Sequence, residues 1–552
     1  MRRQTSSRGF ATLSAASVIS KVLAFVYLPI QAMLVHDSGN GVIGAGLMLY
    51  LFIYSLSNAG LPVIISKFIS ERDELGDYQG SQVIFKTAFF MTLTLGLIFS
   101  LLTFFGAGFL ADWCRMPESK LMFMVIAPSF LFASVTCSLR GYFQGKQNMK
   151  PTAASQIIEQ IINSLMTALL EICFFHYAQQ ANKDTVTYTA AGSAAATVLA
   201  AVGSMSFLVV MYVFTFRRFR GEETSRQSYT GPEIKRGYVF RRILMFSIPA
   251  IISCIATSAA NIIDTRSCVP MLLKGGFTSD QAYALFGIYS QKFQRLMTLP
   301  VLFAYPLVMA MMPSLSAAIM RGDRDYFRYE ISEGYRLNFI VVMPIVAGIS
   351  FLAKPILTVI YTTQNAGSMM IILGTWTAII TTIQTIQSGV LVALDKPLIT
   401  PATLLIGMVF KIVCNYILIP IHAVNIYGAL IGNTVAWLIS IAINQYYINK
   451  LMEKEENALK HVLRPGALAL IMGALCLGFY RLVYALLKLV SGSYLLTNDL
   501  AVLFTIPFGA VLYFTMMVRS GGISENDLRR LPKGNRIVSV CMKFPFLRSA
   551  LT

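Results

Sequence analysis

Charged side chains stand singly inside long apolar stretches of this sequence, where burial in lipid is costly. Lys21 follows Ser14 and Ser17 at helical spacing, so the three lie on one narrow polar face of a helix. At 1.5 Å per residue, Lys21 would lie about 10–15 Å from the end of its stretch. That depth favours a cation in a water-filled cavity that could bind an anion. The alternative is a lysine whose side chain extends back to the interface.

Four further polar residues share a face in the stretch 282–312: Gln291, Lys292, Arg295 and Thr298. Two cations one turn apart repel each other unless an anion lies near them. Arginine suits fork-like binding of phosphate oxygens. We therefore predict that Arg295 and Lys292 bind a phosphate-bearing substrate together with Lys21. The alternative is a set of structural hydrogen bonds to helix carbonyls.

A third polar face runs along the stretch 152–177 and contains Gln156, Glu159, Gln160 and Asn163. Glu159 could pair with a cation in a cavity, or it could bind a proton or Na⁺. An interhelical polar clamp is an equally open interpretation of this face.

Other charged residues are weaker candidates for a binding site. Asp264 lies near the end of the stretch 240–272, and Lys411 lies inside the stretch 398–421. Lys67 and Arg140 stand near the ends of their stretches, where side chains that extend to the interface are the simpler explanation.

These residues require membrane-spanning helices to position them. The chain has 552 residues, of which 56 % are hydrophobic, and we count about fourteen apolar stretches of some 20 residues or more. They are 11–35, 42–69, 84–111, 121–143, 152–177, 185–214, 240–272, 282–312, 337–360, 369–394, 398–421, 425–448, 465–490 and 496–518. We therefore predict an all-α polytopic membrane protein. Pro300 and Pro306 predict a bend in the eighth span rather than two spans.

The net charge of +19 does not indicate nucleic-acid binding, because the basic residues are distributed by loop. Basic clusters precede the first span, lie at 217–242 and 321–328, and occur in the tail. The alternate loops are short and nearly without Lys or Arg. Lys and Arg residues in the basic segments outnumber those in the alternate loops by about five to one, which is the positive-inside pattern. Both termini are therefore predicted to be cytoplasmic.

Metal and nucleotide chemistry find no support in the sequence. The eight cysteines are scattered, without a CxxC pair or a Cys/His cluster. The segment 141–147, GYFQGKQ, superficially resembles a phosphate loop. A Walker motif needs four residues between the glycines and Ser or Thr after the Lys. We predict no metal site, no ATP site and no cofactor.

The chain repeats itself weakly in two places. Asp77-Tyr78 is matched by Asp325-Tyr326, and residues 146–151 are matched at nearly the same separation by residues 396–401. A repeat of six spans predicts two lobes related by a pseudo-two-fold axis along the membrane normal, with the binding site between them. The predicted parts are an N-lobe at 1–216, a basic linker at 217–239, a C-lobe at 240–450, two more spans within 451–518 and a basic tail at 519–552.

Several segments resemble the MurJ/SpoVB/YtgP branch of the multidrug/oligosaccharidyl-lipid/polysaccharide (MOP) flippase superfamily. They are SKVLAF at 20–25, GLPVIISK at 60–67, LRGYFQGKQNMKPTAASQIIEQ at 139–160 and RLMTLP at 295–300 followed by MPSLS at 312–316. The resemblance covers nearly the whole chain, and the segment 139–160 is the most specific. It implies two six-helix lobes that alternate between inward- and outward-open states, with a groove for a lipid tail formed by the last two helices.

The resemblance also implies a cargo and its binding residues. The cargo would be an undecaprenyl-diphosphate-linked saccharide, such as lipid II or another cell-wall, spore-cortex or polysaccharide precursor, moved across a bacterial plasma membrane. Family cavity arginines match Arg295 and, with a change of type, Lys21, whereas Tyr27 stands where a second arginine is found in related proteins. Lys67 matches a basic position at the end of span two.

Partners and driving force follow from that cargo. The expected partners are the lipid-linked saccharide, membrane lipid and the cell-wall synthesis machinery. The inside-negative potential favours outward movement of an anion by about 2.3 kcal/mol per charge per 100 mV. Coupling to that potential, to H⁺ or to Na⁺ could therefore replace ATP.

Three other functions are alternatives. A cation-coupled multidrug exporter of the related MATE-like class would favour acidic cavity residues and lack the last two spans, whereas the deepest candidates here are mostly basic. A membrane glycosyltransferase would need an acidic cluster at the membrane face, and the predicted outer loops are short and poor in carboxylates. A non-transporting scaffold would not need charges inside its spans. We therefore predict a flippase that is not an enzyme.

Overall fold

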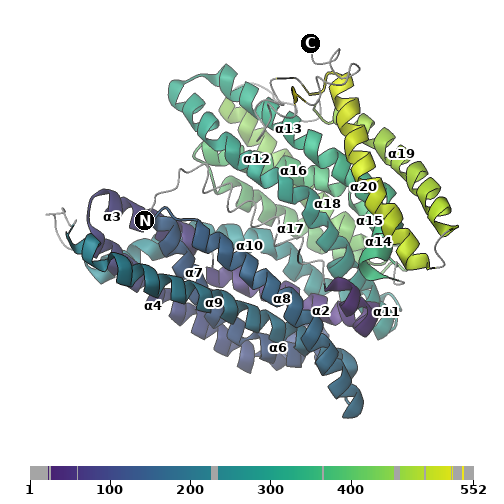
Figure 1. The fold of residues 1–552 in the computed structure, drawn as a ribbon, viewed down its shortest axis with the longest axis horizontal. Helices are drawn as coiled ribbons and strands as arrows, with labels where there is room; N and C mark the ends of the chain where they lie inside the picture. The colour runs from purple at the N-terminus through teal and green to yellow at the C-terminus, as the bar shows by residue number, and fades with distance from the viewer. Residues whose placement is uncertain are drawn as a thin grey trace. The chain divides into compact units, whose positions relative to one another are not determined.

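The chain is built from helices. The structure is a computed structural model and describes residues 23, 27–58, 60–225, 234–362, 366–452, 461–489, 493–523, 525 and 538–539. All regular elements in these ranges are helices (Figure 1), which confirms the all-α fold. They are α2 Leu28–Asn58, α3 Leu61–Glu74, α4 Tyr78–Phe105, α5 Ala107–Cys114, η1 Pro117–Ser119, α6 Lys120–Ile126, α7 Pro128–Gly145, α8 Lys150–Gln180, α9 Thr185–Ser225, α10 Arg236–Lys274, α11 Ser279–Gly287, η2 Ile288–Phe293, α12 Gln294–Arg321, α13 Arg324–Phe351, α14 Ala353–Tyr361, α15 Ser368–Gly374, α16 Thr377–Ala393, α17 Ile399–Leu418, α18 Tyr427–Met452, α19 Leu463–Lys488 and α20 Tyr494–Arg519.

The number of spans differs from the prediction. Among the described residues, 10 helices are long and apolar enough to cross a membrane, or 12 if each of two bent helix pairs is one span. The predicted count of fourteen is therefore not confirmed. Most of the predicted span 11–35 lies outside the described residues. The predicted span 282–312 is divided among α11, η2 and α12.

Helix breaks occur where local chemistry requires them. α6 and α7 meet at an angle of 41°, and Pro128 is the first residue of α7, where its missing N–H costs nothing. α2 contains a kink at His36, whose φ is 53°. α12 passes through Pro300 and Pro306 as one helix, and the irregular turn lies before it, in the π-helix η2. The sequence pattern does not indicate this π-helix.

The chain divides into two compact units. Unit 1 is Met1–Gln291 with Met408–Asn433, and unit 2 is Lys292–Gly407 with Thr434–Thr552. This division follows contacts rather than the sequence repeat, and the lobes and linker derived from the repeat remain a prediction.

In unit 1, α8 packs on α9, and α7 packs on α3, α4 and α9 (Figure 1). α2 packs on α10 and α11. Gly141 and Gly145 let α7 approach α3, because a Cβ atom at either position would come closer than 3.0 Å to Ile65 or Ile69. The segment that superficially resembles a phosphate loop is therefore a small-xxx-small helix-packing motif.

In unit 2, α13 is central and packs on α12, α16 and α19, while α20 packs on α14 and α19. Phe479 of α19 stacks on Phe508 of α20 with ring centroids 4.1 Å apart. Asn498 of α20 accepts a 2.8 Å hydrogen bond from Tyr480 and donates one of 3.2 Å to the Pro355 carbonyl. The last two long helices thus belong to the packed body of unit 2.

Two turns share one local geometry. Gly76 precedes α4 with a φ of 72°, and Gly322 precedes α13 with a φ of 69°. Each glycine is followed by an N-cap aspartate: Asp77 accepts from the Gly80 N–H at 2.8 Å, and Asp323 accepts from the Tyr326 N–H at 2.9 Å. The two turns therefore share one backbone conformation. In this comparison Gly76-Asp77 corresponds to Gly322-Asp323. The sequence match instead pairs Asp77 with Asp325, so the two alignments differ by two positions.

Candidate functional site

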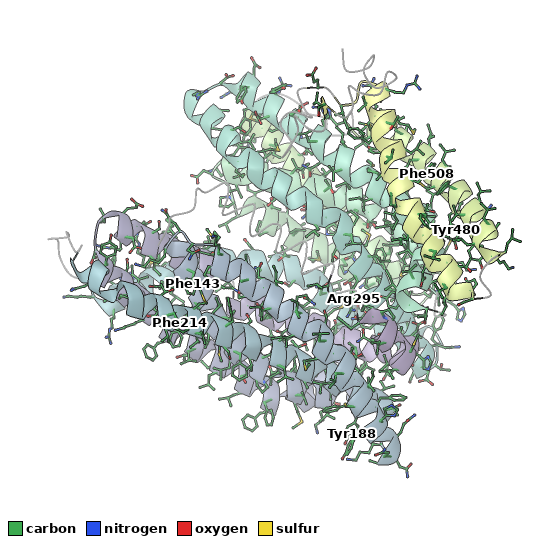
Figure 2. The ribbon with its side chains drawn as sticks, in the orientation of Figure 1. Phe143, Tyr188, Phe214, Arg295, Tyr480 and Phe508 are labelled. Carbon is green, nitrogen blue, oxygen red and sulfur yellow. The ribbon has the colours of Figure 1, made fainter. Side chains whose placement is uncertain are left out.

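The residues predicted to bind phosphate have separate surroundings. Lys21 lies outside the described residues. Arg295 is the second residue of α12 (Figure 2) and is half-buried. Thr298 is exposed, and its hydroxyl donates to the Arg295 carbonyl at 2.7 Å. The role of Arg295 in binding a substrate stays a prediction.

Lys292 is completely buried, which the sequence did not indicate. Its ammonium donates to the Ala366 carbonyl at 3.3 Å and lies 5.2 Å from the centre of the Tyr361 ring. Gln291 is also buried, beside Gly44 of α2. Both residues lie in the π-helix η2, whose turn is wider than that of an α-helix, so the α-helical spacing behind the predicted face does not apply there. In this conformation Lys292 joins η2 to the connection between α14 and α15.

Arg140 does not extend to an interface. Its Nη2 donates to the Glu159 carboxylate at 2.6 Å and to the Ser204 hydroxyl at 3.2 Å, and its Nε donates to the Ser155 hydroxyl at 3.0 Å. We call these four residues the Arg140 cluster. They come from α7, α8 and α9. Glu159 therefore has a cationic partner, which the sequence analysis had left unidentified.

The rest of the polar face of α8 lies beside this cluster. Gln156 and Asn163 are half-buried. Gln160 donates to the Ser164 hydroxyl at 3.2 Å, and Ser164 donates to the Leu23 carbonyl at 2.8 Å. The face thus combines interhelical contacts with a carboxylate that is 34 % exposed. Both interpretations of it, clamp and cavity wall, retain support.

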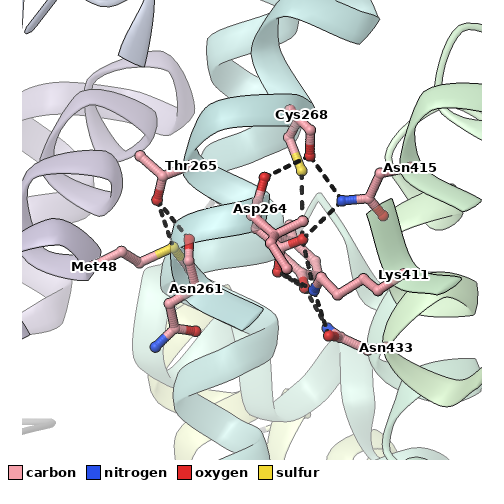
Figure 3. A network of polar contacts seen from close by, with 11 residues as sticks. Met48, Asn261, Asp264, Thr265, Cys268, Lys411, Asn415 and Asn433 are labelled. Carbon is pink, nitrogen blue, oxygen red and sulfur yellow. Dashed lines mark hydrogen bonds and ion pairs between the residues drawn. The ribbon is translucent and has the colours of Figure 1, made fainter. Parts of the chain in front are cut away.

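Asp264 and Lys411, far apart in the sequence, form one buried ion pair (Figure 3). The Lys411 ammonium lies 2.7 Å from the Asp264 carboxylate, and both side chains are 0 % exposed. The same carboxylate accepts hydrogen bonds from the Tyr289 hydroxyl at 2.6 Å and from Asn415 at 3.1 Å. Asn433 accepts from Lys411 and donates to the Tyr289 hydroxyl. We call these five residues the Asp264 network.

The Asp264 network joins α10, η2, α17 and α18 within unit 1. A charge removed from water must be paired and hydrogen-bonded, and here both charges are. In this conformation the two residues bind each other, so neither presents a charge to a substrate. The sequence analysis missed Tyr289, Asn415 and Asn433. The four-residue spacing of Lys411 and Asn415 in an apolar helix was the signal that could have indicated one of them.

Lys67 lies in an open setting in the middle of α3. Its side chain is 56 % exposed, 4.0 Å from Glu71 and 5.0 Å from the centre of the Phe246 ring. Glu71 also pairs with Arg242 of α10 at 3.4 Å. Lys67 thus contributes to a charged surface between α3 and α10.

The fold is that of MOP superfamily transporters. The chain is similar to the solved structure of lipid II flippase MurJ in an inward closed conformation, with a TM-score of 0.64, 14% sequence identity, and coverage of 91% of this chain and 97% of that one. It is also similar to an inward-facing multidrug resistance MATE transporter of the MOP superfamily, with a TM-score of 0.63, 14% identity, and coverage of 79% and 96%. The protein is therefore a multi-pass membrane protein with a transporter fold.

The chain belongs to the polysaccharide biosynthesis protein family, which matches residues 6–319. It is 24% identical over 451 residues to lipid II flippase MurJ of Bacillus subtilis (strain 168), covering 79% of this chain and 80% of the relative. It is 26% identical over 339 residues to stage V sporulation protein B of the same organism, covering 61% and 63%. The resemblance to the MurJ/SpoVB branch of the MOP superfamily is thereby confirmed.

Proposed function

We propose that this protein is a flippase, and not an enzyme, that moves an undecaprenyl-diphosphate-linked saccharide from the inner to the outer leaflet by alternating access. A diphosphate cannot cross hydrocarbon unaided, because each charge loses its hydration there. Cations held within the spans offset that loss. Arg295 and Lys21 are the proposed cations for the diphosphate.

The observation that carries the proposal is the half-buried cation Arg295 in α12, in a chain of the polysaccharide biosynthesis protein family. Similarity to lipid II flippase MurJ over four fifths of each chain supports the cargo class. Lipid II, a spore-cortex precursor and another polysaccharide precursor share the same lipid diphosphate, so the proposal extends to all three.

The chain should restore growth to bacterial cells depleted of their lipid II flippase. Arg295→Ala should reduce the rescue about 10- to 100-fold, the range expected when one charge-assisted contact to a phosphate is lost. Lys21→Ala should have a similar effect, and Arg295→Lys a smaller one. Colony counts at equal membrane expression measure the effect. Arg321→Ala is the matched control, because Arg321 is exposed on the same helix. Full rescue by both alanine variants would refute the site assignment.

Outward flipping should slow when the membrane potential is collapsed. A doubly charged headgroup gains about 4.6 kcal/mol at 100 mV, twice the value for one charge. Accessibility of the lipid at the outer leaflet of proteoliposomes, with and without a potassium diffusion potential, measures the effect. Ionophores that collapse only the H⁺ or Na⁺ gradient separate potential from ion coupling. An unchanged rate after loss of the potential contradicts this driving force.

A second candidate is cation-coupled export of a small organic cation. The specific observation that favours it is the 34 % exposed carboxylate of Glu159, which a cationic substrate could contact. MATE transporters share the fold. Under this candidate, Glu159→Gln would raise the drug susceptibility of an exporter-deficient host above that of the same host with the wild-type chain. Under the first candidate, expressing the chain would leave the drug susceptibility of the host unchanged.

Topology and partners complete the proposal. The proposed location is a bacterial plasma membrane. Both termini are proposed to lie on its cytoplasmic side, because the positive-inside pattern predicts this orientation. The N-lobe at 1–216 and the C-lobe at 240–450 are the proposed moving parts. Membrane lipid and the cell-wall synthesis machinery are the proposed partners.

A further inference from the structure

Among the described residues of unit 1, the ion pairs Asp264–Lys411 and Arg140–Glu159 differ in exposure. Asp264 and Lys411 are both 0 % exposed, whereas Arg140 is 13 % and Glu159 34 % exposed. A dissolved ion cannot reach a fully buried pair, so such a pair only joins the helices that carry it. A partly open pair stabilises little, because water competes with it, and a dissolved ion can take the place of one partner. The Arg140 pair is therefore suited to exchange.

Two serines bind the Arg140 guanidinium in addition to Glu159. Ser155 on α8 and Ser204 on α9 accept from its Nε and Nη2, and both serines are 0 % exposed. Ser155 is itself anchored by donating to the Thr152 carbonyl at 2.8 Å. The guanidinium would thus stay oriented if the Glu159 carboxylate moved away, and it would present a planar set of donors to another anion.

We propose that Arg140 is a third cation that binds the diphosphate of the cargo, in addition to Arg295 and Lys21, and that Glu159 occupies this position on Arg140 until the diphosphate displaces it. This inference rests on the proposed function. A diphosphate carries at least two charges and can form two parallel hydrogen bonds with a guanidinium, so it competes well with one carboxylate. Glu159 then acts as an internal counter-ion that keeps the cation paired between transport cycles.

The neighbouring turn of α8 supports a ligand at this place. Asn163, one turn beyond Glu159, has a buried side-chain oxygen that accepts no hydrogen bond from the described residues. A buried polar atom without a partner is costly. A hydroxyl donor on a saccharide next to the diphosphate would satisfy it.

Binding of three probes to the full-length purified protein in nanodiscs tests the proposal: undecaprenyl diphosphate, undecaprenol and inorganic diphosphate. Glu159→Gln should bind undecaprenyl diphosphate about tenfold more tightly than wild type, since the competing charge is gone. Arg140→Gln, and Arg140→Gln with Glu159→Gln, should bind it about tenfold more weakly. Undecaprenol should not distinguish the variants. If the site recognises the charge alone, the affinities of wild type and the variants for inorganic diphosphate should rank in the same order. If the site requires the lipid, inorganic diphosphate should bind neither wild type nor the variants.

Glu333→Gln is the matched control, because Glu333 pairs with Arg336 in unit 2, and it should bind like wild type. If Glu159→Gln does not fold, Glu159→Asp, whose shorter side chain reaches Arg140 less well, should also bind more tightly than wild type. Equal or weaker binding by the folded Glu159 variant overturns the inference and leaves the pair a structural clamp. If that result accompanies normal rescue of flippase-depleted cells, only the inference fails. If the binding order holds without rescue, the proposed function fails and the anion site remains.

Discussion

Lys411→Met should lower the free energy of unfolding by about 3–5 kcal/mol, the usual cost of leaving one partner of a buried ion pair alone. Asp264 would then remain fully buried with three neutral hydrogen-bond donors, Tyr289, Asn415 and Cys268, and no cation from Lys411. Methionine matches lysine in length and shape, so the change removes charge rather than volume. Equilibrium unfolding in mixed micelles, followed by circular dichroism, measures the loss.

The double variant Asp264→Asn with Lys411→Met separates charge from packing. With both charges gone, the stability should return most of the way to that of wild type, because a neutral asparagine needs no cation. Lys274→Met is the control, since Lys274 is exposed at the end of the same helix as Asp264. A double variant as unstable as Lys411→Met would show that the ammonium matters through its hydrogen bonds to Asn433 rather than through charge balance.

Gly287→Leu should separate α11 from α2 and destabilise unit 1 by about 1–3 kcal/mol or more, as overpacking of a tight contact does. A Cβ atom at Gly287 would come closer than 3.0 Å to the Asp37 carbonyl and the Gly41 nitrogen, and one at Gly41 would meet the Tyr283 carbonyl. These neighbours are backbone atoms, which cannot rotate away. Only movement of a whole helix makes room.

Hydrogen exchange of α11, together with equilibrium unfolding, measures this effect. Gly41→Ala should produce the same loosening to a smaller extent, because a methyl group is smaller than an isobutyl group. Gly348→Ala is the control, since a Cβ atom there would meet nothing within 4 Å, and alanine favours a helix more than glycine does. Unchanged protection of α11 in Gly287→Leu would mean that α2 and α11 do not hold each other as closely as the structure shows.

Much of the fold could be predicted from the sequence, because hydrophobicity and helical period are local properties. The all-α class and the family resemblance were confirmed. The polar face of α8 was also readable, since residues three and four apart must share a side of one helix. The count of spans was not, because hydropathy measures apolar length and does not reveal where a helix breaks, as at η2.

Pairing between helices was decided only by the tertiary structure. Lys411 and Asp264 are 147 positions apart, and neither sequence context indicates the other. Lys292 resembled a cavity cation but is buried against Tyr361 and Ala366, in a π-helix to which α-helical spacing does not apply. Sequence by itself determined which segments are helices in a membrane and which of their residues carry charge. The packing of those helices determined which charges neutralise each other and which remain open to a ligand, because burial and distance are properties of the assembled fold.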